Sequence, residues 1–124
     1  MTRQTNTSES KKFKINVNGG KWLRVCLVWF DRANSNVQNI LGLLVTNNDR
    51  TKKWIGNKGF IGTGDTYGVF DNNNTVQVVR IEQPEPGDYF IKIFGVQVSE
   101  PPQDYALVAT GTFGSKLELF PIGN

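Results

Sequence analysis

The sequence predicts an all-β fold, an antiparallel β-sandwich of the jelly-roll type with seven to eight strands. Short apolar segments that alternate with a period of two residues are separated by turns rich in glycine, asparagine and proline. No segment of useful length has the 3.6-residue periodicity of an amphipathic helix. The 124 residues are enough for one domain, which can fold without disulfides.

The first strands are predicted near the N-terminus. Residues 1–11 are polar and are expected to form a flexible segment or linker, so the single domain spans residues 12–124. Apolar and polar residues alternate from Lys12 to Val17, which is typical of a half-buried strand. The segment from Trp22 to Phe30 is apolar at almost every position, so we expect a central strand with both faces buried.

A hairpin and a long loop are predicted in the middle of the chain. Two apolar segments, residues 41–46 and 51–55, flank the turn residues Asn47 to Arg50, which indicates a β-hairpin. Residues 56–74 are rich in glycine and lack periodicity. A loop of that length is uncommon in a compact domain and often carries function.

Three further strands are predicted in the last part of the chain, followed by a short one. Residues 75–81, 88–98 and 104–111 are apolar or alternating segments separated by proline-containing turns. Residues 117–122 contain enough apolar positions for a short final strand.

The composition excludes several kinds of site. The chain has no histidine, so it can form neither a Ser-His-Asp triad nor a His-ligated zinc site. Cys26 is the single cysteine and is expected to be a small buried side chain. The net charge is +3, but the basic residues are spread along the sequence, so no nucleic-acid partner is expected. No apolar run approaches the roughly 18 residues that a membrane span needs.

Five short segments in a fixed order resemble a known family. They are Leu23 to Asp31, Gly56-Asn57, Asp71 to Gln77, Pro86 to Tyr89 and Pro102 to Leu107. In this order they resemble the β-sandwich (P/PPC-like, pre-peptidase C-terminal) domain that follows the catalytic domain in many subtilisin-like serine proteases. The resemblance covers residues 12–111. It implies a non-catalytic, secreted accessory domain whose partner is the protease catalytic domain of the same parent chain or a protein substrate.

The resemblance also implies a possible Ca²⁺ site. Calcium-binding members of the family carry two aspartates where this chain has Ile40 and Gly42, and a glutamate where it has Gln77. The oxygen ligands that remain for Ca²⁺ are Asp71, Asn73, Asp31 and Asp65. Asp71 is the best of these. The alternative is that residues 71–74 form a turn whose side chains bond to the backbone.

Two other functions compete with an accessory role. Trp54, Phe60 and Tyr67 flank the predicted loop and are expected to be exposed, where they would form a platform for a carbohydrate-binding module. Loop aromatics also commonly hold a loop against the sandwich. A carboxylate pair that includes Asp71 or Asp65 would suit a small hydrolase, although aspartates at strand ends are equally typical of turns.

Overall fold

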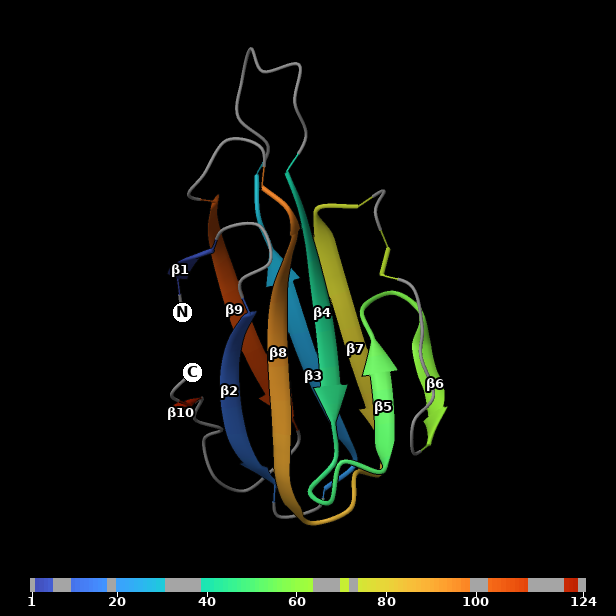
Figure 1. Cartoon of the computed structure of the whole chain (residues 1–124). Coiled ribbons are helices and arrows are strands. Elements are labelled where there is room, and N and C mark those ends of the chain that lie inside the picture. The colour runs from blue at the N-terminus through green and yellow to red at the C-terminus, as the bar shows by residue number, and fades with distance from the viewer. Residues whose placement is uncertain are drawn as a thin grey trace.

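The computed structural model describes residues 2–5, 10–17, 20–30, 39–63, 70–71, 74–98, 103–111 and 120–122, and these form two antiparallel sheets packed face to face (Figure 1). The four-stranded sheet contains, in spatial order, β1 (Thr2–Thr5), β9 (Gln103–Gly111), β3 (Trp22–Val28) and β7 (Val76–Glu82). The six-stranded sheet contains β10 (Phe120–Ile122), β2 (Ser10–Val17), β8 (Gly87–Gln97), β4 (Ile40–Thr46), β5 (Lys52–Ile55) and β6 (Gly59–Thr63).

The strand order is that of a jelly roll. In each sheet the first strands of the chain lie beside the last ones, in the orders β1-β9-β3-β7 and β2-β8-β4-β5. The remaining strands, β6 and β10, extend the two edges of the six-stranded sheet. Apart from the β4–β5 hairpin, the jelly-roll strands alternate between the sheets along the chain. The predicted fold class, an antiparallel β-sandwich of jelly-roll type, is confirmed.

The core lies between the sheets and follows the predicted alternation. Phe13, Ile15 and Val17 point inward from β2, as expected, and Trp29 is 3% exposed. The other large side chains in this core are Leu23, Val25, Leu27, Leu41, Leu43, Val45, Trp54, Val79, Ile81, Tyr89, Ile91, Ile93, Val98, Tyr105 and Leu107. Burial of a side chain of this size contributes about 1.5–3 kcal/mol, so the two inner faces hold the sandwich together.

The prediction for β3 was half right. The strand is central, because it pairs with both β7 and β9. Its inner face is buried, but its outer face is only half-buried, and Cys26 lies there. Phe30, just beyond the strand, is 82% exposed. A sandwich has two layers, so only one face of each sheet meets the core, and apolar residues on the outer face gave a false signal of burial.

Two strands lie where the sequence predicted none. β1 falls within the expected flexible segment, where Thr2 pairs with Ala106 and Thr5 with Gln103. β6 falls within the expected loop and pairs with β5 after a turn in which Asn57 and Gly59 have positive φ angles of 64° and 77°. Backbone pairing places both strands, and neither leaves a period-two apolar pattern in the sequence. No helix in the described residues is long and apolar enough to cross a membrane.

Candidate functional site

Two of the recognised segments meet at the carboxylate of Asp71. Asp71 is 7% exposed, and its Oδ2 accepts hydrogen bonds of 2.8 Å from Asn57 Nδ2 and 2.8 Å from Asn74 Nδ2. Asn57 is fixed in turn, because its Oδ1 accepts a 3.0 Å bond from Val78 N. The two asparagines therefore satisfy a buried carboxylate that would otherwise lose its hydration without compensation.

Gln77 ties the two sheets together. It projects from β7 into the interior and is fully buried. Its Oε1 accepts a 3.1 Å bond from Leu43 N, and its Nε2 donates to Leu41 O at 3.1 Å. The same Nε2 donates to Asp71 O at 2.8 Å. Gln77 thus joins the four-stranded sheet to β4 of the six-stranded sheet and also fixes the segment that carries Asp71.

Gly56 makes room for this arrangement. Its backbone N donates to Leu43 O at 3.0 Å, which places the Gly56 backbone against the Gln77 side chain. A Cβ at Gly56 would lie 2.7 Å from Gln77 Cβ and 2.8 Å from Gln77 Oε1. Glycine is therefore required here because the backbone approaches another chain segment closely.

A second buried network contains residues from the first and last of the recognised segments. Trp29 Nε1 donates to Asn39 O at 3.1 Å, and Asn39 Nδ2 donates to Gln103 Oε1 at 2.7 Å. Gln103 Nε2 donates to Phe30 O at 3.2 Å and to Asp104 O at 2.8 Å. This network links β9 to the segments that follow β3 and precede β4. The hydrogen bonds of both networks are therefore made between segments of the same domain.

In the described residues, the Asp71 carboxylate is held by side-chain amides of the same chain. A cation needs oxygen lone pairs directed at it, whereas Asp71 Oδ2 already accepts two N–H groups. The amide of Gln77 also donates to two backbone carbonyl oxygens beside it, Leu41 O and Asp71 O. Among the described residues no group of three or more His, Cys, Asp or Glu is placed to hold a metal. The other predicted ligands, Asp31, Asp65 and Asn73, lie outside the described residues.

The predicted aromatic platform is only partly exposed. Trp54 is 8% exposed, so the expectation that it is exposed was wrong. It points inward from β5 opposite the buried Val45, and its ring centroid lies 5.6 Å from that of Phe60 and 6.3 Å from that of Tyr89. Phe60 is 54% exposed, and Tyr67 lies outside the described residues. A buried indole cannot stack on a sugar ring, so the structure gives the carbohydrate hypothesis no support from Trp54.

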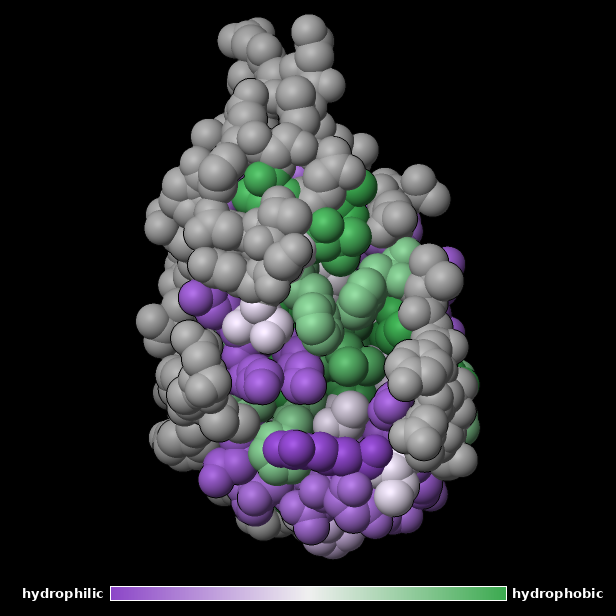
Figure 2. Space-filling view, viewed as in Figure 1, coloured by the Kyte–Doolittle hydropathy of each residue, from purple (hydrophilic) through white to green (hydrophobic). Residues whose placement is uncertain are grey.

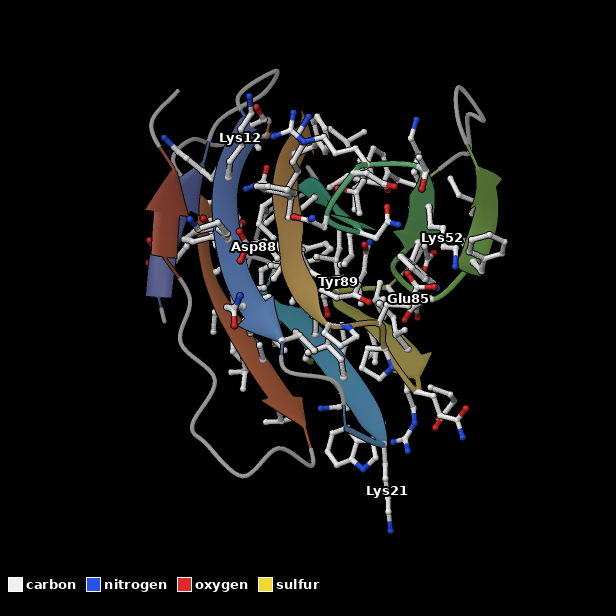
Figure 3. All side chains as sticks on the ribbon, turned by 90° about the horizontal axis from the view of Figure 1, so that it is seen from below. Lys12, Lys21, Lys52, Glu85, Asp88 and Tyr89 are labelled. Atoms are coloured by element: carbon white, nitrogen blue, oxygen red, sulfur yellow. The ribbon has the colours of Figure 1, made fainter. Side chains whose placement is uncertain are left out.

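A small polar pocket of about 140 Å³ lies between the β4–β5 and β7–β8 turns. Tyr89 Oη donates to Glu85 O at 3.1 Å, and Lys52 Nζ lies 3.2 Å from Glu85 Oε1 (Figure 3). Burial raises the pKa of Tyr89, and the Glu85 charge raises it further. The hydrogen bond from Thr51 Oγ1 lowers the pKa of Asp49. Both groups therefore titrate outside the neutral range, which suits hydrogen bonding and not acid–base catalysis.

The structure also gathers basic residues that the sequence analysis treated as spread out. Lys12 of β2 lies directly opposite Lys92 of β8 on the outer face of the six-stranded sheet. Burial lowers the pKa of Lys92, and the cations that lower it further are Lys12, Arg50 and Lys53. In the sequence, this cluster is visible only as basic residues at outward positions of two alternating strands. They can be recognised as neighbours only when the pairing of β2 with β8 is known.

Comparison with known proteins gives one informative similarity. No protein-family model matches the chain. In an alignment 119 residues long that covers 90% of the chain, it is 30% identical to the "Serine protease/ABC transporter B family protein tagA" of Dictyostelium discoideum. The similarity is to a serine-protease-related protein. The chain spans only 7% of the length of that relative. It therefore aligns with only a small part of that much longer protein.

Proposed function

We propose that this chain is a non-catalytic accessory domain of a multidomain serine-protease-related protein of the subtilisin-like class, where it stabilises the protease or holds its protein substrate. The observation that carries the proposal is the similarity to the serine protease/ABC transporter, which extends over 90% of this chain. The five recognised segments independently favour the same kind of protein. The proposal includes export of the parent protein from the cell.

The chemistry of the chain supports a role without catalysis. The chain has no histidine, so a serine protease triad has to come from another domain. Asp71, the conspicuous buried carboxylate, accepts two amide N–H groups and sits in the cluster anchored by Gln77. A tethered domain still affects proteolysis, because it raises the effective concentration of a substrate near the catalytic site.

The first test is the reading frame of the gene that encodes this sequence. We expect an in-frame serine protease domain that contributes its own histidine. The purified chain is then mixed with that catalytic domain. Binding to the native catalytic domain at about 100 times the dissociation constant stabilises it by about 2.7 kcal/mol, which raises its melting temperature by several degrees.

The control for this test is an unrelated β-sandwich of similar net charge at the same concentration, which should leave the melting temperature unchanged. Deletion of the accessory domain from the parent protein should also slow cleavage of a folded protein substrate more than cleavage of a short peptide. A gene without a protease domain would contradict the proposal. So would a parent protein whose melting temperature and protein cleavage are both unaffected by the deletion.

A further inference from the structure

The outer face of the six-stranded sheet carries cations that repel each other. Lys12 and Lys92 are directly opposite in the antiparallel β2–β8 pair, where like charges destabilise a sheet. In the same pair Lys14 lies opposite Phe90, so basic and aromatic side chains alternate across the two strands. Lys12 points out from this face, while Lys21 points away on the opposite side of the molecule (Figure 3). An anion bound here would relieve the repulsion.

Arg50 completes the basic group from a neighbouring turn. Its guanidinium carbon lies 4.5 Å from the centroid of the Phe90 ring, and its backbone N donates to Asn47 O at 3.0 Å. Its φ angle is 62°, in the left-handed region that glycine and asparagine adopt more easily than arginine. The turn therefore holds a strained arginine whose side chain is oriented by an aromatic ring, a geometry suited to bidentate contact with a carboxylate.

Two aromatic rings of this face, Phe90 and Phe94, each have a neighbouring side chain. Arg50 lies over Phe90, and Phe70 lies beside Phe94 with ring centroids 5.2 Å apart and planes inclined by 44°. Figure 2 shows apolar side chains next to hydrophilic ones on this face of the sandwich. The surface thus combines cations with apolar area.

We propose that this face binds an acidic segment of a protein, with Arg50, Lys12 and Lys92 contacting its carboxylates and Phe90 and Phe94 its apolar side chains. The proposal rests on the accessory function above and identifies the surface and the partner chemistry. Outward side chains repeat every two residues, about 6.8 Å, along a strand. Lys12 and Lys14 stand at this repeat along β2, so an extended segment with a carboxylate at every second position fits them, while Lys92 lies beside Lys12 on β8.

The test uses the whole chain and a fluorescein-labelled peptide in which glutamates alternate with serines and leucines. We expect saturable binding by fluorescence anisotropy that weakens as salt is added. The double variant Lys12→Gln/Lys92→Gln should weaken binding at least about tenfold, because it removes two charged hydrogen-bond donors. Arg50→Gly should weaken binding about fivefold or more, and it keeps the fold because glycine suits a φ of 62°.

The matched control is Lys21→Gln/Lys58→Gln, which makes the same change in net charge at two exposed positions outside this face. It should bind the peptide like the unmodified chain. Failure to bind the peptide, or equal losses in the control and in Lys12→Gln/Lys92→Gln, would overturn the proposal. Equal binding of a single-stranded DNA oligonucleotide or of anionic phospholipid vesicles would also overturn it, because the face would then recognise polyanions in general.

The two proposals fail separately. If the chain stabilises the catalytic domain of its parent protein but does not bind the acidic peptide, the surface assignment is wrong and the accessory function stands. If the peptide binds and the face variants abolish this, while the catalytic domain is unaffected, the surface stands and the accessory function is wrong.

Discussion

Replacing Gln77 by glutamate tests whether the amide of this side chain holds the sheets together. Gln77→Glu keeps the size of the side chain and keeps an oxygen for Leu43 N. It removes the N–H groups that bond to Leu41 O and Asp71 O. The perturbation therefore removes two hydrogen bonds and introduces an ionisable carboxyl at a position with no solvent exposure.

The magnitude follows from the groups left without a partner. A buried carbonyl that loses its donor costs about 1–3 kcal/mol, so two of them cost about 2–6 kcal/mol when the new carboxyl is ionised. A protonated carboxyl donates one O–H and restores one of the two bonds, which reduces the loss to about 1–3 kcal/mol. Small domains have a total unfolding free energy of about 5–15 kcal/mol, so either loss is easily measured.

The variant should also acquire a characteristic pH dependence. Burial beside two carbonyl oxygens raises the pKa of the new carboxyl in the folded state above its unfolded value of about 4.3. Between the two pKa values the folded state binds more protons than the unfolded state, so stability falls as the pH rises through that range. Relative to the unmodified chain, Gln77→Glu should therefore lose least at about pH 4 and most at about pH 7.

The assay is urea unfolding followed by tryptophan fluorescence, with the variant and the unmodified chain compared at both pH values. Gln83→Glu is the matched control, because Gln83 is exposed and its backbone N–H, which bonds to Lys21 O, is unchanged by the substitution. It should alter stability by less than about 0.5 kcal/mol. A loss for Gln77→Glu below about 1 kcal/mol at neutral pH, or the same loss at both pH values, would refute the reasoning.

Three further predictions follow from the same geometry. Gly56→Ala should destabilise the chain by about 1–3 kcal/mol, because its Cβ would lie 2.7 Å from Gln77 Cβ. Gly59→Ala has nothing within 4 Å of its Cβ, so it should cost only the backbone strain of about 1 kcal/mol. Urea unfolding compares the two variants, and equal losses of stability would contradict the steric argument. The pKa of Tyr89 should lie above the usual 10.0, and Glu85→Gln should lower it, which ultraviolet titration of the phenolate measures; an unchanged titration would exclude the Glu85 effect. Stability linked to Tyr89 should persist below the unfolded pKa and be lost as the pH rises through the folded pKa. Millimolar Ca²⁺ should leave the melting temperature where EDTA leaves it, and a clear rise would show that residues other than Asp71 create a site.

The sequence allowed the fold to be predicted wherever burial shapes the pattern of side chains. β2 and β8 alternate because one side of each strand faces the core, and the β4–β5 hairpin is marked by its turn residues Asn47 to Arg50. β1 and β6 could not be predicted, because backbone pairing places them and their short sequences have no period-two apolar pattern. Trp54 was misjudged because its position beside a predicted loop suggested exposure, whereas its place opposite Val45 directs it inward.

The candidate site was harder to predict than the fold because its members are distant in the sequence. Lys12 and Lys92 become neighbours only through the pairing of β2 with β8, which joins the first and last parts of the jelly roll. Arg50 reaches the same face from the β4–β5 turn, where its own backbone has the left-handed conformation. Nothing in the local sequence around these residues indicates which strands pair. The candidate calcium ligands were chosen from the family resemblance and their oxygen chemistry, and the structure shows Asp71 bonded to side-chain amides.

The five segments that resemble the protease-associated family and the cations on the outer face of the six-stranded sheet have different roles in this chain. Asn57, Asp71 and Gln77, which belong to those segments, form hydrogen bonds within the sandwich, whereas Lys12, Arg50 and Lys92 lie outside all five segments. A resemblance that rests on residues holding a fold together can persist while the surface residues change. It therefore supports the same architecture for this chain but does not identify the binding partner. The two groups should then be separable: Gln77→Glu should lower stability, Arg50→Gly should lower peptide affinity, and the stability loss of the double variant should equal the sum of the single losses within about 0.5 kcal/mol.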